Sequence, residues 1–198
     1  QQDQGSVSLL TLGALTNVAL ALHLDHRLPG KVQRCYLMGG DFGAAPERRR
    51  HLQSEYNIRC DPEAAAVVFA AGFDLTVVGV DITTQVKLPA DHLDPLRTSS
   101  HPLARLYVAA VEDFLTLYGR DWNIPHDAIT LAAMLRPDLI RTEPLAVGVE
   151  LCGNYARGVT LGVREGGETA ALGPARVAVE VDGEAFREFY LDRLYTLC

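Results

Sequence analysis

The stretch DPEAAAVVFAAGFDLTVVGVD, residues 61–81, places a helix signal directly before a strand signal. Asp61 is a typical N-cap residue, Pro62 is suited to the first helical position, and an acid follows in the first turn. The helix is expected to end at Gly72. The next segment, residues 75–81, is β-branched and apolar throughout, which is typical of a strand buried on both faces of a parallel sheet.

The same alternation precedes this stretch. Residues 7–12 predict a short buried strand, residues 16–24 a helix rich in alanine and leucine, and residues 32–38 a second strand that ends in two glycines. Strands that alternate with helices favour a mostly parallel sheet flanked by helices, so we expect an α/β fold.

After this stretch the pattern is helical, then β-like, then helical again. Residues 101–119 are amphipathic, residues 126–135 are almost entirely apolar and are expected to lie deep, and residues 184–195 predict a last helix. Between them LAVGVEL, RGVTLGV and ARVAVEVD are β-like. Residues 39–60 predict a long polar loop, usually a functional lid or a disordered segment. No repeat or linker interrupts the pattern, so we expect a single domain over residues 1–198.

The composition excludes several classes of function. The 198 residues carry a net charge of −7, so no basic footprint indicates binding to nucleic acid or to an anionic membrane. No apolar run reaches the roughly 18–20 residues of a membrane span. The four cysteines lie far apart without a CxxC pair, which favours reduced thiols over a disulfide or metal site. We therefore expect a cytoplasmic protein.

Ligands of parallel α/β sheets bind at the carboxyl ends of the strands. The segments predicted to reach that edge carry Leu12, Met38, Asp81, the run Glu55-Tyr56-Asn57 and the pair His126-Asp127.

The pair His126-Asp127 opens the most apolar helix of the chain. Asp127 is either a cap or first-turn acid that stabilises the helix, or a carboxylate that ligates a hard cation such as Ca²⁺ or binds a sugar hydroxyl. In the second case His126 can act as an acid near neutral pH.

The run Glu55-Tyr56-Asn57 has two interpretations as well. It is either a solvated loop or a binding element, because a carboxylate and an amide bind hydroxyls while an aromatic ring packs on a ring. Such a set suits a polyol attached to a flat base. Arg48 to Arg50 are interpreted as solvated, with contact to an anionic substrate or partner as the alternative.

Five segments resemble, in order, the inosine–uridine-preferring nucleoside hydrolase family. GALTNVALAL is similar to that family's G-x-LTN-[IV]-A-x-A, and LMGG follows; SEYNIRCDPEAA is similar to AEFN-x-x-x-DPEAA, TVVGVDITTQV to MVGLDLTHQ, and IPHDAITLAAMLRPDL to HDPLA-x-A-x-x-[DN]-P. The resemblance covers nearly the whole chain. It implies a Rossmann-like α/β fold and hydrolysis of the N-glycosidic bond of ribonucleosides to ribose and free base, a reaction of purine and pyrimidine salvage.

The resemblance also implies a tightly bound Ca²⁺ that orients the attacking water and the ribose diol. Asp127 is then expected as a calcium ligand that also touches the ribose 3′-hydroxyl, and the carbonyl of Leu12 as a second ligand. His126 is expected near the leaving base, where it assists protonation. Such a reaction needs charge stabilisation at an oxocarbenium-like sugar, an activated water and an acid for the base.

The remaining implied residues bind the substrate. Glu55 and Asn57 are expected to hold ribose hydroxyls, Met38 to pack against the sugar, and Tyr56 to pack against the base. Members of the family are commonly dimers or tetramers, so a homo-oligomer is expected.

One part of the family's pattern has no match in this chain. Members begin with D-x-D-x-G-x-D-D on their first strand, which supplies the general base and most calcium ligands, whereas this chain opens with residues that match a later point. We therefore expect a C-terminal portion of such a protein, with a fold that lacks the N-terminal strands. Its calcium site would need further oxygens, because Ca²⁺ takes about six to eight.

Two other functions remain open. A catalytically inactive homologue would keep the fold and act as a nucleoside-binding or interaction protein. A nucleotide-binding module would use the arginines at 48–50 to hold a phosphate.

Overall fold

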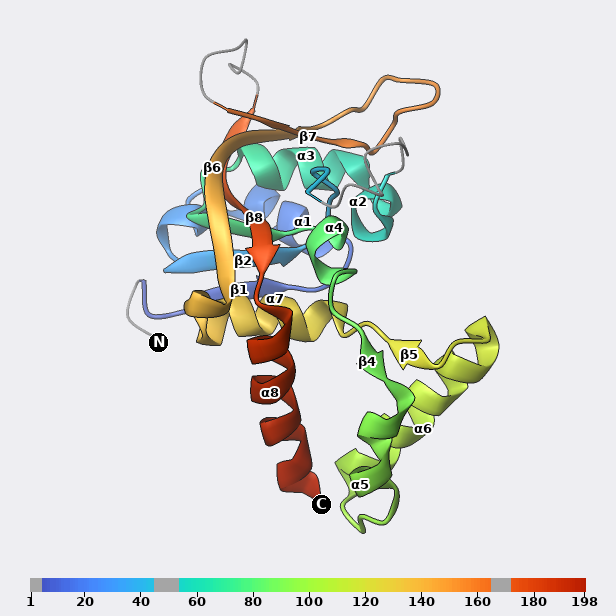
Figure 1. The fold of residues 1–198 in the computed structure, drawn as a ribbon. Helices are drawn as coiled ribbons and strands as arrows, with labels where there is room; N and C mark the ends of the chain where they lie inside the picture. Colours follow the sequence, from blue (N-terminus) through green and yellow to red (C-terminus); the bar gives the residue numbers. More distant parts are fainter. Residues whose placement is uncertain (1–4, 45–53, 165–171) are drawn as a thin grey trace.

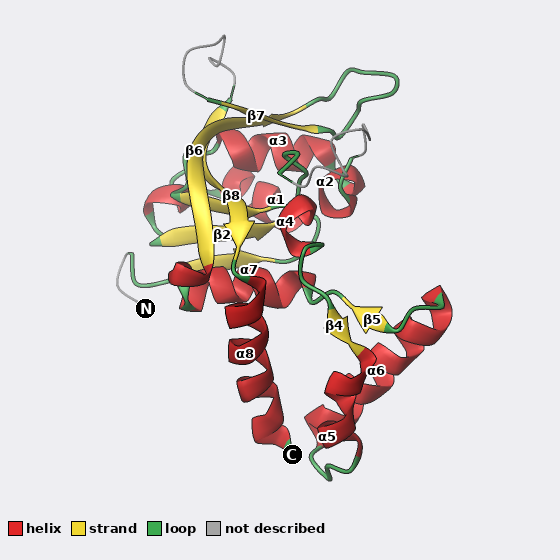
Figure 2. Ribbon diagram, in the orientation of Figure 1, coloured by secondary structure: helices red, strands yellow, loops and turns green. Residues whose placement is uncertain are grey.

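The computed structural model describes residues 5–44, 54–164 and 172–198. Within these ranges the strands of the main sheet lie in the order β1-β2-β3-β8-β6-β7 (Figures 1 and 2). β1, β2, β3 and β8 run parallel, whereas β6 is antiparallel to both β8 and β7. The strands are β1 Ser8–Thr11, β2 Arg34–Met38, β3 Leu75–Val78, β6 Ile140–Val149, β7 Thr160–Val163 and β8 Gly173–Val181.

This sheet confirms the predicted α/β fold with a mostly parallel sheet. The three β-like segments late in the chain form β6, β7 and β8. β8 returns from the end of the chain to pair with β3, so the centre of the sheet joins segments about a hundred residues apart, such as Val77 and Val177.

Helices cover both faces of the sheet (Figure 1). α1, α2 and α3 contribute to the core on one face, and α4, α7 and α8 to the core on the other. Successive residues of β2 serve the two faces in turn, because Cys35 and Leu37 belong to the first core and Tyr36 to the second. The helices are α1 Thr16–Leu24, α2 Tyr56–Cys60, α3 Pro62–Ala70, α4 Val80–Thr83, α7 His126–Leu135 and α8 Gly183–Leu194.

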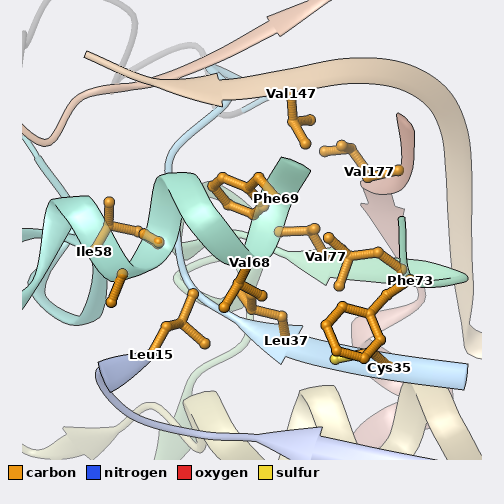
Figure 3. Close-up of a cluster of buried hydrophobic side chains, with 14 of the residues drawn as sticks. Leu15, Cys35, Leu37, Ile58, Val68, Phe69, Phe73, Val77, Val147 and Val177 are labelled. Atoms are coloured by element: carbon orange, nitrogen blue, oxygen red, sulfur yellow. The ribbon is translucent and has the colours of Figure 1, made fainter. Parts of the chain in front are cut away.

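The first core lies between α3 and the sheet (Figure 3). Val68 and Phe69 of α3 are buried beside Leu37 and Val77 of the parallel strands. α3 also approaches β8 so closely that a Cβ at Gly173 would lie 1.7 Å from the carbonyl oxygen of Phe69. Only glycine allows this contact, so the helix and the central strand are packed backbone to backbone.

The start of α3 forms as its sequence predicts. The Asp61 carboxylate accepts a hydrogen bond from the Ala64 amide at 3.1 Å, and Pro62 takes the first helical position. The same carboxylate accepts a hydrogen bond from the Thr16 hydroxyl at 2.5 Å. One N-cap therefore also joins α3 to the start of α1.

One predicted strand is too long. β3 was expected to reach residue 81, but it ends at Val78 and Val80–Thr83 form the short helix α4. The Val80 amide donates to the carbonyl of Gly40 at 2.8 Å, which turns the chain out of the sheet. Local β-propensity is overridden here by a contact made far along the chain.

The predicted polar loop over residues 39–60 is also partly wrong. Tyr56–Cys60 form the short helix α2 directly before α3. Arg48 to Arg50 of the same loop lie outside the described residues.

A helical extension stands beside the sheet and joins it through a two-stranded ribbon (Figure 1). The ribbon pairs Leu88 with Asn123 and Pro89 with Trp122, and the extension has its own apolar cluster. Its elements are β4 Leu88–Pro89, α5 Asp94–Arg97, α6 Pro102–Tyr118 and β5 Trp122–Asn123. Within the described ranges, the helices are all too short or too polar to cross a membrane.

A buried carboxylate fixes the chain that follows β2. Asp81 is fully buried in α4, and its Oδ2 atom accepts hydrogen bonds from the amides of Phe42 at 3.2 Å and Ala44 at 2.8 Å. Its Oδ1 atom has no hydrogen-bond partner among the described residues. Burial raises the pKa of the Asp81 carboxyl, and the nearby charge of Asp41 adds to this shift.

The first prediction tests the core under α3. Val68 is fully buried and its neighbour Val67 is half exposed, so the two valines form a matched pair. Val68→Ala should lower the free energy of unfolding by about 2 kcal/mol, because two buried methyl groups are lost and a cavity is left. Val67→Ala should change it by less than about 0.5 kcal/mol. Urea unfolding followed by circular dichroism measures both, and equal effects would contradict the assignment of this core.

The second prediction concerns the Asp81 carboxyl and pH. Because its folded-state pKa lies above the ordinary value of 3.8, its contribution to stability is complete below that pH and is lost as the pH rises through the folded-state pKa. Wild type should therefore lose stability relative to Asp81→Asn as the pH rises from 3.8 towards neutrality. Urea midpoints at a series of pH values measure the difference.

Asp138→Asn is the control of opposite sign. The Arg136 guanidinium lowers the pKa of the Asp138 carboxyl, so wild type should gain stability relative to that variant as the pH rises. A stability difference for Asp81→Asn that does not change with pH would show that burial leaves this carboxyl unperturbed.

Candidate functional site

The candidate site lies where β1, β2 and β3 end. Register pairs Thr11 with Leu37 and Met38 with Val78, so the three strands finish side by side. Leu12 follows β1 directly, is partly exposed, and continues the register next to Met38. The carboxyl ends of parallel strands are where such folds bind ligands.

Glu55 ties this edge to α2. It is the N-cap of the helix, and its Oε1 accepts a hydrogen bond from the Asn57 amide at 3.0 Å. Its Oε2 accepts from the Ile58 amide and, from the end of β2, from the Gly40 amide, both at 3.2 Å. A carboxylate offers about four acceptor positions, so one position remains for a hydroxyl. The sequence interpretation missed this capping role, because glutamate is not among the preferred N-cap residues serine, threonine, aspartate and asparagine.

Asn57 is held by Met38 at the end of β2. Its Nδ2 atom donates to the Met38 carbonyl at 3.1 Å and lies 3.3 Å from the Met38 sulfur. Both donors of the amide therefore face the strand, and the carbonyl oxygen of the side chain is left as an acceptor. The structure thus brings Met38, Glu55 and Asn57 together, as the sequence predicts.

Tyr56 lies apart from these three residues. Its side chain is 67% exposed, and the Arg59 guanidinium lies 5.6 Å from the ring centroid. Tyr56 is therefore a surface residue of α2, whereas Met38 is buried.

His126 and Asp127 begin α7 next to α4. The Nδ1 atom of His126 lies 2.6 Å from the hydroxyl of Thr83, which joins α7 to the helix that follows β3. Asp127 is exposed in the first turn, and partial desolvation raises the pKa of its carboxyl. The N-cap position is Pro125, which makes no side-chain cap bond, so Asp127 is a first-turn acid and not the N-cap.

The sequence predicts that Asp81 reaches this edge, but the structure buries its side chain. It is fully buried and binds the backbone of residues 42 and 44. Its role is to fix the chain between Gly40 and Ala44, and no pattern in the local sequence indicates those distant partners.

The two predicted metal ligands do not form a metal cluster by themselves. In the described part of the chain, no group of three or more histidine, cysteine, aspartate or glutamate side chains could hold a metal ion. The carbonyl of Leu12 and the carboxylate of Asp127 are two oxygens, whereas Ca²⁺ takes about six to eight.

A separate cavity of about 560 Å³ lies between α1 and α3. Thr16, His23, Asp61 and Val67 are among its lining residues, and none of the predicted site residues lines it. The Asp61 carboxylate in this cavity is already bonded to Thr16 and to the α3 backbone.

Solved structures share this arrangement of strands and helices. A plant nucleoside hydrolase, PpNRh1, matches with a TM-score of 0.82 and 29% identity, covering 97% of this chain and 63% of its own. A purine-preferring ribonucleoside hydrolase from Gardnerella vaginalis matches with a TM-score of 0.82 and 26% identity, covering 98% of this chain and 62% of its own.

Curated relatives agree with the structural likeness. The pyrimidine-specific ribonucleoside hydrolase RihA of Shewanella woodyi is 34% identical over 99% of this chain and 63% of its own length. The corresponding RihA of Escherichia coli O1:K1 is 32% identical over 98% of this chain and 63% of its own length. The chain thus spans less than two thirds of these relatives. The family described as inosine-uridine preferring nucleoside hydrolase matches residues 1–188, and the chain belongs to this family.

Proposed function

We propose that the protein hydrolyses the N-glycosidic bond of ribonucleosides to ribose and a free base. The observation that carries the proposal is the arrangement at one sheet edge. Asn57 and Glu55 offer oriented acceptors at the end of β2, and His126 and Asp127 begin α7 against the helix that follows β3. Relatives named for purine and for pyrimidine nucleosides share this family, which supports a common reaction on the ribose side.

The ribose is the part of the substrate that this chain is best prepared to bind. The side-chain carbonyl of Asn57 accepts a hydrogen bond from one ribose hydroxyl, since its amide group is already bound to Met38. The remaining acceptor position on Glu55 serves a second hydroxyl, and the buried Met38 packs against the sugar. Tyr56 is the proposed contact for the base, although it requires the exposed ring to turn inwards.

The reaction breaks the bond between C1′ and the base nitrogen and forms a bond between C1′ and a water oxygen. Positive charge develops on the sugar, so a carboxylate such as Asp127 stabilises the transition state. The departing base takes up a proton, and His126 is the residue of this chain proposed to assist. The water loses a proton to a general base that the described residues do not assign.

Calcium is the proposed cation, with the Asp127 carboxylate and the Leu12 carbonyl as ligands. The described residues do not fit a complete calcium site, because these two oxygens are fewer than the roughly six to eight that the ion takes. We propose that the complete gene product contributes the other ligands.

A nucleoside-binding homologue without catalysis is the second candidate. The lack of a metal-ligand cluster among the described residues favours it, because a family member without a complete site would keep the ribose contacts of Asn57 and lose turnover.

Assembly and compartment are also proposals. We propose a homo-oligomer, a dimer or tetramer, in the cytoplasm. Exposed leucines on α6, such as Leu103 and Leu106, provide apolar surface that an assembly could cover.

The first test is a reducing-sugar assay with inosine, uridine, adenosine and cytidine, each with and without Ca²⁺. The chain alone should release little ribose, and the complete gene product should release it in a calcium-dependent reaction. Nucleoside binding without any ribose release by the complete product would establish the second candidate in place of the hydrolase.

Asn57→Ala tests the ribose contact. Loss of one preorganised polar contact should lower kcat/KM of the complete product by about a hundredfold or more, equal to roughly 3 kcal/mol. Asn154→Ala, at an exposed asparagine in the connection between β6 and β7, is the matched control and should leave kcat/KM unchanged. A loss below tenfold for Asn57→Ala would remove Asn57 from the binding site.

Asp127→Ala tests the carboxylate at α7. Calcium binding measured by calorimetry and ribose release should both be abolished, because the variant loses a charged ligand and the charge opposite the sugar cation. Asp113→Ala, at an exposed aspartate of α6, should leave both unchanged. Turnover retained by Asp127→Ala would refute the metal and catalytic roles together.

A further inference from the structure

Thr83 makes an unusually direct contact with the proposed acid. It is the last residue of α4, its side chain is fully buried, and its Oγ1 atom lies 2.6 Å from Nδ1 of His126. The same hydroxyl lies 3.4 Å from the Val80 carbonyl, so its short contact is the one with the imidazole.

We infer that Thr83 is the positioning residue for His126, and that it assigns the two ring nitrogens their roles. Because Nδ1 is occupied by the hydroxyl, the ring meets the substrate base through Nε2. This inference rests on the proposed function, since it concerns the reaction in which His126 assists the leaving base.

The physical reason is that an imidazole with no fixed partner rotates and exchanges between two tautomers. A hydrogen bond to one nitrogen selects both the ring orientation and the proton position. A threonine hydroxyl suits this role because it can donate or accept, and its β-branched side chain has few rotamers. A hydrogen bond of this length holds the ring within the tolerance that proton transfer requires.

The support behind Thr83 is rigid. Its amide donates to the Gly79 carbonyl at 3.1 Å, and the Val80 amide donates to the Gly40 carbonyl at 2.8 Å. The hydroxyl that holds His126 is therefore fixed to the ends of β3 and β2, the same edge that holds Asn57. His126 and the residues proposed to bind ribose are therefore attached to the same strand ends.

Thr84 provides a matched control beside it. Its hydroxyl donates to the same Val80 carbonyl, at 2.7 Å, and is not bonded to His126. Removal of either hydroxyl deletes one polar group, from the buried last residue of α4 or from the half-buried residue that follows it, but the contact with the ring is made by Thr83.

The experiment compares Thr83→Val, Thr83→Ser and Thr84→Val in the complete gene product. With inosine, Thr83→Val should lower kcat by about a hundredfold, the scale of a lost general acid, with KM nearly unchanged. Thr83→Ser should restore most of kcat because it keeps the hydroxyl. Thr84→Val should match wild type.

A riboside with a better leaving group separates positioning from a general structural defect. With 4-nitrophenyl riboside the departing phenolate needs little protonation, so Thr83→Val should stay within about threefold of wild type. Equal losses of kcat on both substrates, or no loss on inosine, would overturn the inference. Ribose release by wild type in the same assay would still uphold the proposed function.

A second measurement needs no turnover. Long-range ¹H–¹⁵N correlation spectra at about pH 8, where a free imidazole is neutral, report the tautomer of His126, assigned by the signal lost in His126→Gln. Thr83→Val should shift this signal, and Thr84→Val should not. An unchanged signal in Thr83→Val would overturn the inference, whether or not wild type releases ribose. Absence of ribose release by wild type would instead count against the proposed function. Thr83→Ala serves in place of Thr83→Val if the latter does not fold.

Discussion

The parallel pairing of β1, β2 and β3 is the constraint on which the candidate site depends. The register places Thr11, Leu37 and Val77 at one level, so the chain segments that leave these strands start from the same edge. The backbone contact between Gly173 and Phe69 holds the central strand against α3 at the opposite, amino end of the strands. Residues far apart in sequence then meet at this edge, as Asn57 meets Met38 and Thr83 meets His126.

Three carboxylates of this fold accept backbone hydrogen bonds. Glu55 caps α2 and binds the end of β2, Asp61 caps α3, and Asp81 binds the chain after β2. Asp127 differs from these three, because it is exposed and lies in the first turn of α7 instead of at the N-cap. The chemistry proposed for the site therefore rests on one carboxylate, one histidine and one amide.

Local signals made most of the fold predictable. Asp61 and Pro62 mark the start of α3, and residues 16–24 and 126–135 are helices with the predicted bounds, because capping and apolar periodicity are local properties. The end of β3 was not predictable, since Val80 leaves the sheet by bonding to Gly40.

The sequence named the candidate residues of the site but not the contacts that hold them. Family resemblance brought Met38, Glu55, Asn57, His126 and Asp127 together as candidates. The capping bonds of Glu55 and the contact between Thr83 and His126 depend on tertiary approach, and no spacing in the sequence reports them.

The attachment of Asp81 has a consequence for how this protein can change over evolutionary time. The carboxylate binds Phe42 and Ala44 through their main-chain amides, and the side chains of those two residues take no part. Any residue other than proline supplies the same donor. The course of the backbone beside the site is therefore held by one aspartate through main-chain donors, whereas the side chains of Phe42 and Ala44 are constrained separately, by packing against the two cores.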